Sequence, residues 1–235
     1  MTYKEIYRMT MSPAKEADEK YLFWDRFLRI PATFLIMPLI SIKTNPTTIT
    51  KLSILSTLIS FCLISFASTP LIRIVGWGFI LLWGIMDNMD GQLARCTNQC
   101  SNLGDLWDTM GGYLAMISIY FSAGIAAFFD ECYYPVFESY LNLIWGGATA
   151  ILSIFPRLMM QKKKNYGESS VVNEIVDKSS FGFTKLLVQN LISPTAFLQP
   201  IFLLSIIFHV LDLFVLFYFL LNSAVTLLTL KKILK

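Results

Sequence analysis

Residues 103–129 have the sequence LGDLWDTMGGYLAMISIYFSAGIAAFF, in which every residue from Thr109 onward is uncharged. A helix needs roughly 20 mostly apolar residues to span the hydrocarbon core of a bilayer. The uncharged part therefore predicts a transmembrane helix. Asp105 and Asp108 would lie at the start of this helix, near the membrane surface.

Other apolar runs lie on both sides of this one. They cover Thr47–Ala67, Leu71–Met86 and Val136–Met160, and a longer stretch runs from Leu186 to Leu230. The longer stretch contains Ser193-Pro194 and Pro200 and, midway, the polar residues His209 and Asp212. We therefore expect two spans divided near His209–Asp212, the first of them kinked or broken at its prolines.

The composition agrees with a membrane location. Hydrophobic residues make up 55% of the 235 residues and charged residues only 15%, whereas a soluble domain has about a quarter charged residues. We predict an all-α integral membrane protein with six transmembrane helices in one domain, residues 47–235. Residues 1–46 mix basic and aromatic side chains, which predicts a cytosolic segment with an interfacial amphipathic helix.

The positions of the basic residues predict which end of the bundle faces the cytosol. With six spans and a cytosolic N-terminus, the inner segments are 1–46, 96–102, 161–185 and 231–235. Nearly every Lys and Arg lies in or near these segments, as the positive-inside rule requires. We expect cytosolic termini, a location in the cytoplasmic membrane of a bacterium, contacts with membrane lipids and no nucleic-acid partner.

Four carboxylates occur where the second and third expected spans adjoin. Asp87 and Asp90 are three residues apart, as are Asp105 and Asp108, and this spacing puts each pair on one face of a helix. A short loop joins the two spans, so all four side chains can converge. Their mutual repulsion requires compensation, and oxygen-only ligands suit Mg²⁺ or Mn²⁺ held together with substrate phosphates. We predict two such ions here, polarising a diphosphate.

Small and basic residues accompany these acids. Gly91 and Ala94 follow on the same helix, and Gly104 lies on its neighbour, where they leave space for a ligand to approach. Arg95 can pair with a diphosphate, because its planar guanidinium matches phosphate geometry.

This segment resembles the signature of the CDP-alcohol phosphotransferase (phosphatidyltransferase) family, Asp-x2-Asp-Gly-x2-Ala-Arg, eight residues, Gly-x3-Asp-x3-Asp. Seven of its eight fixed positions match: Asp87, Asp90, Gly91, Ala94, Arg95, Gly104 and Asp108. The resemblance implies that the three Asp residues bind metal and that the other four cradle the CDP moiety. It also implies six spans, a homodimer and CMP as a product. Pro46–Thr50 resembles the family's entry to its first span.

The eighth position is Gly112, where the family has the Asp that is credited with deprotonating the acceptor hydroxyl. Removing a general base typically lowers a rate by about 10²–10⁴-fold. Three explanations are open. In the first, Asp105 compensates for the missing Asp as an extra metal ligand. It is less suited to act as the base, because two helical turns separate it from position 112. In the second, the acceptor is already ionised or loses its proton through metal-bound water. In the third, the protein only binds CDP compounds or carries a substitution. Asp105 and Asp108 are the catalytic candidates.

Arg157 lies near the cytosolic end of the fourth expected span, beside Lys162–Lys164. The resemblance points to an acceptor-phosphate pocket there, completed by Lys185. The alternative is that Arg157 and the lysines contact anionic lipid headgroups. Gln189 and Asn190, at the entry to the fifth expected span, are further candidates to face the site.

The predicted function is metal-dependent transfer of a phosphate-linked group from a CDP-activated donor to an acceptor with release of CMP, in phospholipid or glycan-substituent biosynthesis. The donor is CDP-diacylglycerol with a polar acceptor, or a CDP-linked small alcohol or phosphonate with a lipid or sugar acceptor. A phosphorylated or otherwise ionised acceptor would accommodate the missing Asp. The alternatives are a catalytically impaired CDP-ligand-binding protein and an ion-coupled transporter, since acids at membrane depth can mark an ion path.

Overall fold

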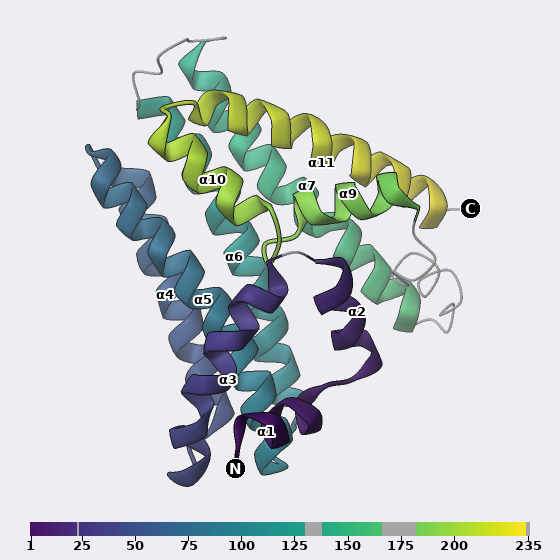
Figure 1. Ribbon diagram of the computed structural model, residues 1–235. Coiled ribbons are helices and arrows are strands. Elements are labelled where there is room, and N and C mark those ends of the chain that lie inside the picture. Colours follow the sequence, from purple (N-terminus) through teal and green to yellow (C-terminus); the bar gives the residue numbers. More distant parts are fainter. Residues whose placement is uncertain (23, 130–137, 166–181, 234–235) are drawn as a thin grey trace.

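The computed structural model describes residues 1–22, 24–129, 138–165 and 182–233. Within these ranges the regular structure is entirely helical, which confirms the predicted all-α class. In chain order the helices are α1 (Tyr3–Thr10), α2 (Pro13–Tyr21), α3 (Asp25–Ser41), α4 (Pro46–Phe66), α5 (Pro70–Thr97), α6 (Asn102–Phe129), α7 (Ser139–Asn165), α9 (Phe183–Ile192), α10 (Leu198–Ile207) and α11 (Leu211–Ile233) (Figure 1).

Among the described residues, five helices are long and apolar enough to cross a membrane, namely α4, α5, α6, α7 and α11. The chain is thus an integral membrane protein. The fifth expected span is divided into α9 and the shorter apolar helix α10, and the break at Ser193–Phe197 contains Pro194. The predicted break at a proline is therefore confirmed. His209, with a φ of 55°, forms the expected turn before α11.

The start of α4 follows from its sequence. Asn45 is the N-cap, and its Oδ1 accepts a hydrogen bond from the Thr47 backbone N–H at 2.9 Å. Pro46 occupies the first helical position, where its missing N–H removes no intrahelical hydrogen bond. The helix therefore begins at Pro46, and its first turn includes Thr50, one residue of the segment that resembles the family's entry to the first span.

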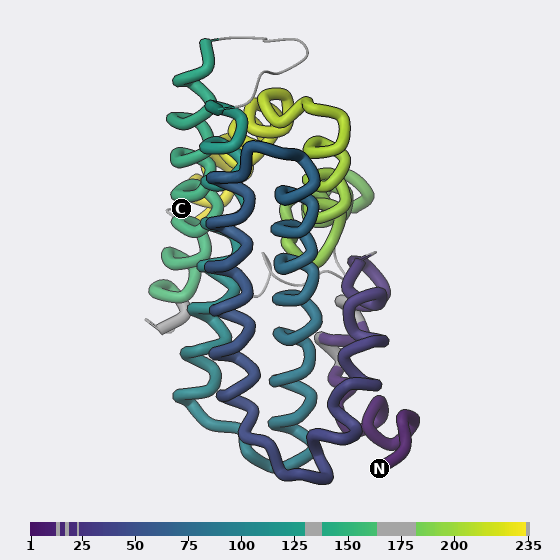
Figure 2. Tube along the Cα trace, turned by 90° about the vertical axis from the view of Figure 1, so that its left-hand side faces the viewer, coloured from purple at the N-terminus to yellow at the C-terminus, as the bar shows by residue number. Residues whose placement is uncertain are grey.

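The long helices pack side by side in an order that determines the position of the site. Helix α4 lies against α5 and α6, α6 packs on α7, and α7 packs on α11 (Figure 2). A Cβ atom added at Gly146 of α7 would lie only 2.7 Å from the Gly124 Cα of α6 and 3.0 Å from the Tyr120 carbonyl oxygen. The two backbones therefore approach closely because neither glycine has a side chain.

Helix α5 continues past Met86, where the apolar run ends, to Thr97. Its extension is amphipathic: Met89 and Leu93 are buried and belong to an apolar cluster with Ala32 and Ile36 of α3. The expected loop 96–102 is accordingly shorter, and the acidic pair of α5 lies inside the helix rather than at its end.

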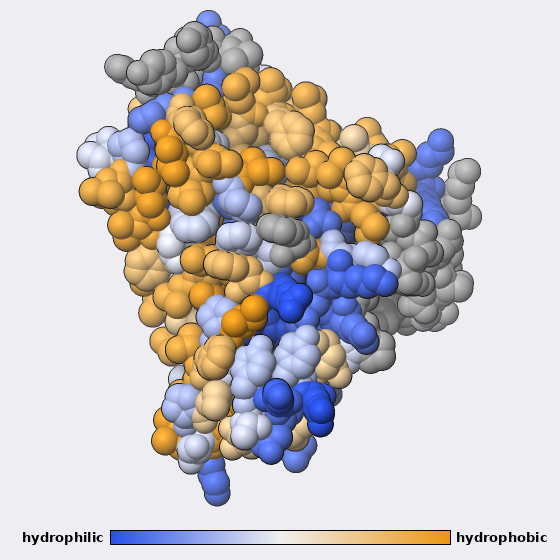
Figure 3. Space-filling view, viewed as in Figure 1, coloured by the Kyte–Doolittle hydropathy of each residue, from blue (hydrophilic) through white to orange (hydrophobic). Residues whose placement is uncertain are grey.

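Residues 1–46, predicted as an interfacial amphipathic segment, form α1, α2 and α3. Helix α3 packs along α5, and the Thr33 hydroxyl donates to Gln92 Oε1 of α5 at 2.9 Å. Figure 3 shows hydrophilic side chains gathered over α1 and α2, whereas hydrophobic side chains cover the face formed by α4, α10 and α11. Helices α1 and α2 therefore contribute to the polar part of this face of the molecule.

Candidate active site

A single cavity contains every residue that matched the signature. It is lined by Asp87, Asp90, Gly91, Ala94 and Arg95 of α5 and by Gly104 and Asp108 of α6. Asp105 also lines it, together with Pro46, Thr47 and Thr50 of α4. We call this space the first cavity. Helices α4, α5 and α6 therefore supply most of its lining.

A short loop brings the two acidic pairs together. Asn98 caps the C-terminal end of α5 in a left-handed conformation with a φ of 53°, and the Gln99 backbone N–H donates to the Ala94 carbonyl at 2.9 Å. Ser101 Oγ then accepts from the Gly104 backbone N–H at 3.0 Å in the first turn of α6. The chain thus reverses within a few residues, so the end of α5 and the start of α6 face each other.

Asp90 is the most constrained of the four acids. It is 5% exposed, and its Oδ2 accepts a hydrogen bond from the Thr50 hydroxyl of α4 at 2.6 Å. A hydrogen-bonded carboxylate is held in one orientation, as the ligands of metal sites usually are. Sequence reasoning noted the segment that contains Thr50 but not this contact, because the pairing crosses between helices.

The donor set suits a hard divalent cation held jointly with a substrate. Asp87 lies within electrostatic range of both Asp90 and Asp108, so the first cavity concentrates negative charge. Over the ranges that the structure describes, no group of three His, Cys, Asp or Glu side chains can hold an ion by itself. Mg²⁺ commonly takes a few carboxylates and completes its shell with water and substrate phosphates. The residues fit that mode of binding.

A second cavity, of about 490 Å³, adjoins the first and shares Asp87 and Asp108 with it. Gly112, Arg157 and Gln189 line this second cavity. A Cβ at Gly112 would meet no atom within 4 Å. The missing side chain therefore leaves open space beside the acids.

Comparison with protein families decides the class of this chain. The family model for CDP-alcohol phosphatidyltransferase matches residues 43–226. The chain belongs to the CDP-alcohol phosphatidyltransferase family. The predicted resemblance is thereby confirmed, and the reaction class is transfer of a phosphate-linked group from a CDP-alcohol. A search of curated proteins and a search of solved structures found no match.

The other predicted site residues of this family member differ in which cavity they line. Asp105 lines the first cavity but not the second, so it does not stand where a carboxylate at position 112 would. Lys185 is exposed and does not line the second cavity beside Arg157. Asn190 uses its Nδ2 to donate to the Tyr21 carbonyl at 2.7 Å, which ties α9 to the end of α2.

Sequence reasoning missed two charged residues of this phosphatidyltransferase that precede the matched region. Lys15 of α2 lines both cavities, and Asp25 at the start of α3 lines the second. The mixed basic and aromatic pattern of residues 1–46 contains no motif that would distinguish them. Only the packing of α2 and α3 against the bundle places them at the site.

Proposed function

We propose that this protein is a metal-dependent phosphotransferase that moves a phosphate-linked group from a CDP-activated donor to an acceptor and releases CMP. The observation that carries this proposal is the convergence of all seven matched signature residues on one cavity. Membership of the CDP-alcohol phosphatidyltransferase family supplies the reaction class. The direct test is CMP release by the purified protein in Mg²⁺ or Mn²⁺ across a panel of CDP-donors and acceptors.

The first cavity is proposed as the donor side. Asp87, Asp90 and Asp108 would hold two Mg²⁺ or Mn²⁺ ions, which when bound polarise the donor's diphosphate and stabilise its leaving group. Thr50 orients Asp90 through its hydrogen bond. The Arg95 guanidinium lies beside Gly91, 3.5 Å from where a Cβ of residue 91 would stand, and it can pair with a donor phosphate.

The second cavity is proposed as the acceptor side, with a phosphorylated or otherwise ionised acceptor. It opens directly beside Asp87 and Asp108, and Arg157 contributes a cation to its lining. An ionised attacking oxygen needs no general base, which agrees with Gly112 in place of the family's Asp. The proposal includes a homodimer, a bacterial cytoplasmic membrane and a cytosolic site, supported by the positive-inside pattern and the family membership.

Arg157→Gln tests the acceptor side. We expect the KM for a phosphorylated acceptor to rise about 10–100-fold, the range for losing one charge-assisted hydrogen bond, while the KM for the donor stays within about twofold. Steady-state assays of CMP release with each substrate varied in turn measure both values. Lys162→Gln, an exposed basic residue on the same helix, is the matched control. Equal increases in both KM values would contradict an acceptor role for Arg157.

Gly112→Asp tests the meaning of the departure from the signature. The side chain enters open space, so we expect the variant to fold. The new carboxylate can accept a proton from an alcohol, which raises CMP release with hydroxyl acceptors by up to about 10²-fold. The same charge repels an anionic acceptor and lowers that rate. Parallel assays with one neutral and one phosphorylated acceptor measure the ratio of the two rates of CMP release. A ratio equal to that of wild type would refute this explanation of Gly112.

A further inference from the structure

We propose that Lys15 of α2 contacts the phosphate group that is transferred, and so is a catalytic residue supplied from outside the region that matches the family, residues 43–226. This inference rests on the proposed function, since it assigns Lys15 to the same site. It follows from where Lys15 lies, from the charges it faces and from the way α2 is held.

Lys15 lies at the junction of the two cavities. Four residues line both of them: Lys15, Asp87, Asn88 and Asp108. In a phosphoryl-type transfer the attacking and leaving oxygens lie roughly in line through the phosphorus. If the donor occupies the first cavity and the acceptor the second, the reacting phosphorus lies at this junction. Lys15 is the cation among the four shared residues.

The charges around Lys15 suit a phosphate that is bound together with metal ions. Its ammonium lies within electrostatic range of the Asp87 and Asp108 carboxylates, which the proposed function assigns to metal. A lysine ammonium is a compact charge on a flexible stem, and it binds phosphate oxygens as a point charge. Once metal ions neutralise the carboxylates, the ammonium remains beside the phosphate oxygens, where it stabilises negative charge in the transition state.

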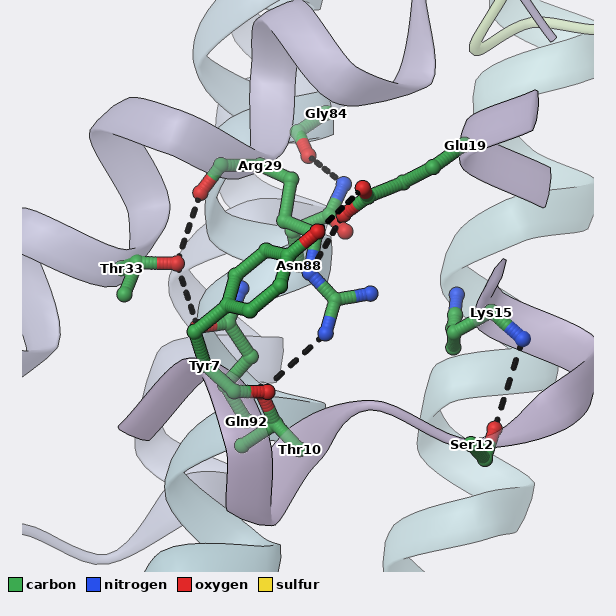
Figure 4. A network of polar contacts seen from close by, with 10 residues as sticks. All are labelled: Tyr7, Thr10, Ser12, Lys15, Glu19, Arg29, Thr33, Gly84, Asn88 and Gln92. Atoms are coloured by element: carbon green, nitrogen blue, oxygen red, sulfur yellow. Dashed lines mark hydrogen bonds and ion pairs between the residues drawn. The ribbon is translucent and has the colours of Figure 1, made fainter. Parts of the chain in front are cut away.

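Glu19, one turn after Lys15 on α2, fixes this helix to its neighbours. Arg29 Nε of α3 forms an ion pair with Glu19 Oε1 at 3.1 Å, and the Tyr7 hydroxyl of α1 donates to Glu19 Oε2 at 2.6 Å. Arg29 is only 2% exposed and also donates to Thr10 Oγ1 at 3.1 Å. Figure 4 shows Glu19 reaching from α2 toward Arg29 and Tyr7. This largely buried network ties α2 to α1 and α3.

Hydrogen bonds of α3 and α9 fix the position of α2 relative to the site. Helix α3 is bonded to α5 by the Thr33–Gln92 hydrogen bond, and the end of α2 is bonded to α9 by Asn190. Lys15 is therefore positioned relative to the acids of α5 from both sides of α2. A cation that is already in position at the junction of the cavities can stabilise the negative charge of the transition state without rearrangement during the reaction.

The transfer balances without any proton moving to or from Lys15. A bond forms between the acceptor oxygen and the donor's β-phosphorus, and the bond from that phosphorus to the bridging oxygen breaks. CMP leaves with the electron pair of the broken bond, and any proton on the acceptor passes to water. Lys15 stays protonated throughout and acts only by its charge and its hydrogen bonds.

The test compares binding of CDP with binding of CMP, because only CDP carries the β-phosphate. Titration calorimetry in Mg²⁺ is made on the full chain in detergent for wild type, Lys15→Gln and Lys15→Arg. We expect Lys15→Gln to weaken CDP binding at least about tenfold and to leave CMP binding within about twofold. Lys15→Arg should retain most of the CDP affinity. Lys20→Gln, an exposed lysine of the same helix, should change neither affinity.

Equal effects of Lys15→Gln on CDP and CMP, or no effect on either, would overturn the assignment. If Lys15→Gln does not fold, Glu19→Gln is used as the second variant. Loss of the ion pair between Glu19 and Arg29 should loosen α2, and CDP binding should then weaken more than CMP binding. CMP release separates the two proposals. A Lys15-dependent preference for CDP without CMP release from any donor refutes the proposed function and with it the catalytic role of Lys15, and supports only its contact with the β-phosphate. CMP release that Lys15→Gln leaves at the wild-type kcat refutes the role of Lys15 alone, and failure of wild type to bind CDP refutes both.

Discussion

Asp87→Asn lowers CMP release by about 10³-fold or more, the scale expected when a transition state loses metal and electrostatic stabilisation together. The amide keeps the size of the side chain but removes the charge that would hold an ion between α5 and α6. Asp108→Asn should have an effect of the same order, because both residues line the junction of the cavities. The measurement is the rate of CMP formation at saturating Mg²⁺, with a chelator-treated wild-type sample as reference.

Binding and stability data distinguish this effect from misfolding. Mn²⁺ binding, followed by electron paramagnetic resonance, should weaken in both variants. Without metal, the thermal unfolding midpoint should stay the same or rise, since Asp87 lies within range of other acids and the amide removes repulsion. Glu138→Gln, an exposed carboxylate before α7, is the matched control and should retain full activity. Wild-type CMP release in both Asp variants would refute the site.

Gly146→Ala should destabilise the bundle by about 1–3 kcal/mol, the usual cost of forcing an extra methyl into a packed interior. The added Cβ would lie 2.7 Å from Gly124 Cα, and backbone atoms cannot yield without separating α6 from α7. For a chain of this size each kcal/mol lowers the unfolding midpoint by about 2–4 °C. Thermal unfolding in one detergent, followed by tryptophan fluorescence, measures the shift.

Gly78→Ala is the control for Gly146→Ala, since it also replaces a glycine inside a long helix. A Cβ at Gly78 meets no atom within 4 Å, and alanine favours a helix over glycine by up to about 1 kcal/mol. We therefore expect an unchanged or slightly higher midpoint. A Gly146→Ala midpoint equal to that of Gly78→Ala would show that the contact between α6 and α7 is looser than described.

The class of the fold and the acidic positions could be predicted because they depend on local sequence. The apolar run after Asp108 is long enough to cross a bilayer wherever its neighbours lie. The three-residue spacing of Asp87 and Asp90 puts both on one helix face in any fold that keeps the helix. The break near Pro194 follows in the same way from the missing N–H of proline.

Other features required the packed structure. The end of α5 could not be predicted from the apolar run, because Met89 and Leu93 are stabilised there by α3. Thr50 reaches Asp90 only because α4 lies beside α5. The Gly124–Gly146 contact depends likewise on how α6 crosses α7. The residues in each of these contacts are far apart in the sequence, and no spacing between them indicates that they meet.

By itself, then, the sequence determined that this protein is a helical membrane protein of the CDP-alcohol phosphatidyltransferase family, with a carboxylate signature whose last position is Gly112. Apolar length, helical periodicity and motif spacing are properties of neighbouring residues. The tertiary structure alone decided that Gly112 lines a second cavity and that Lys15 lines both cavities. Residues far apart in the chain meet only through side-chain packing between helices, and that packing is a property of the whole fold.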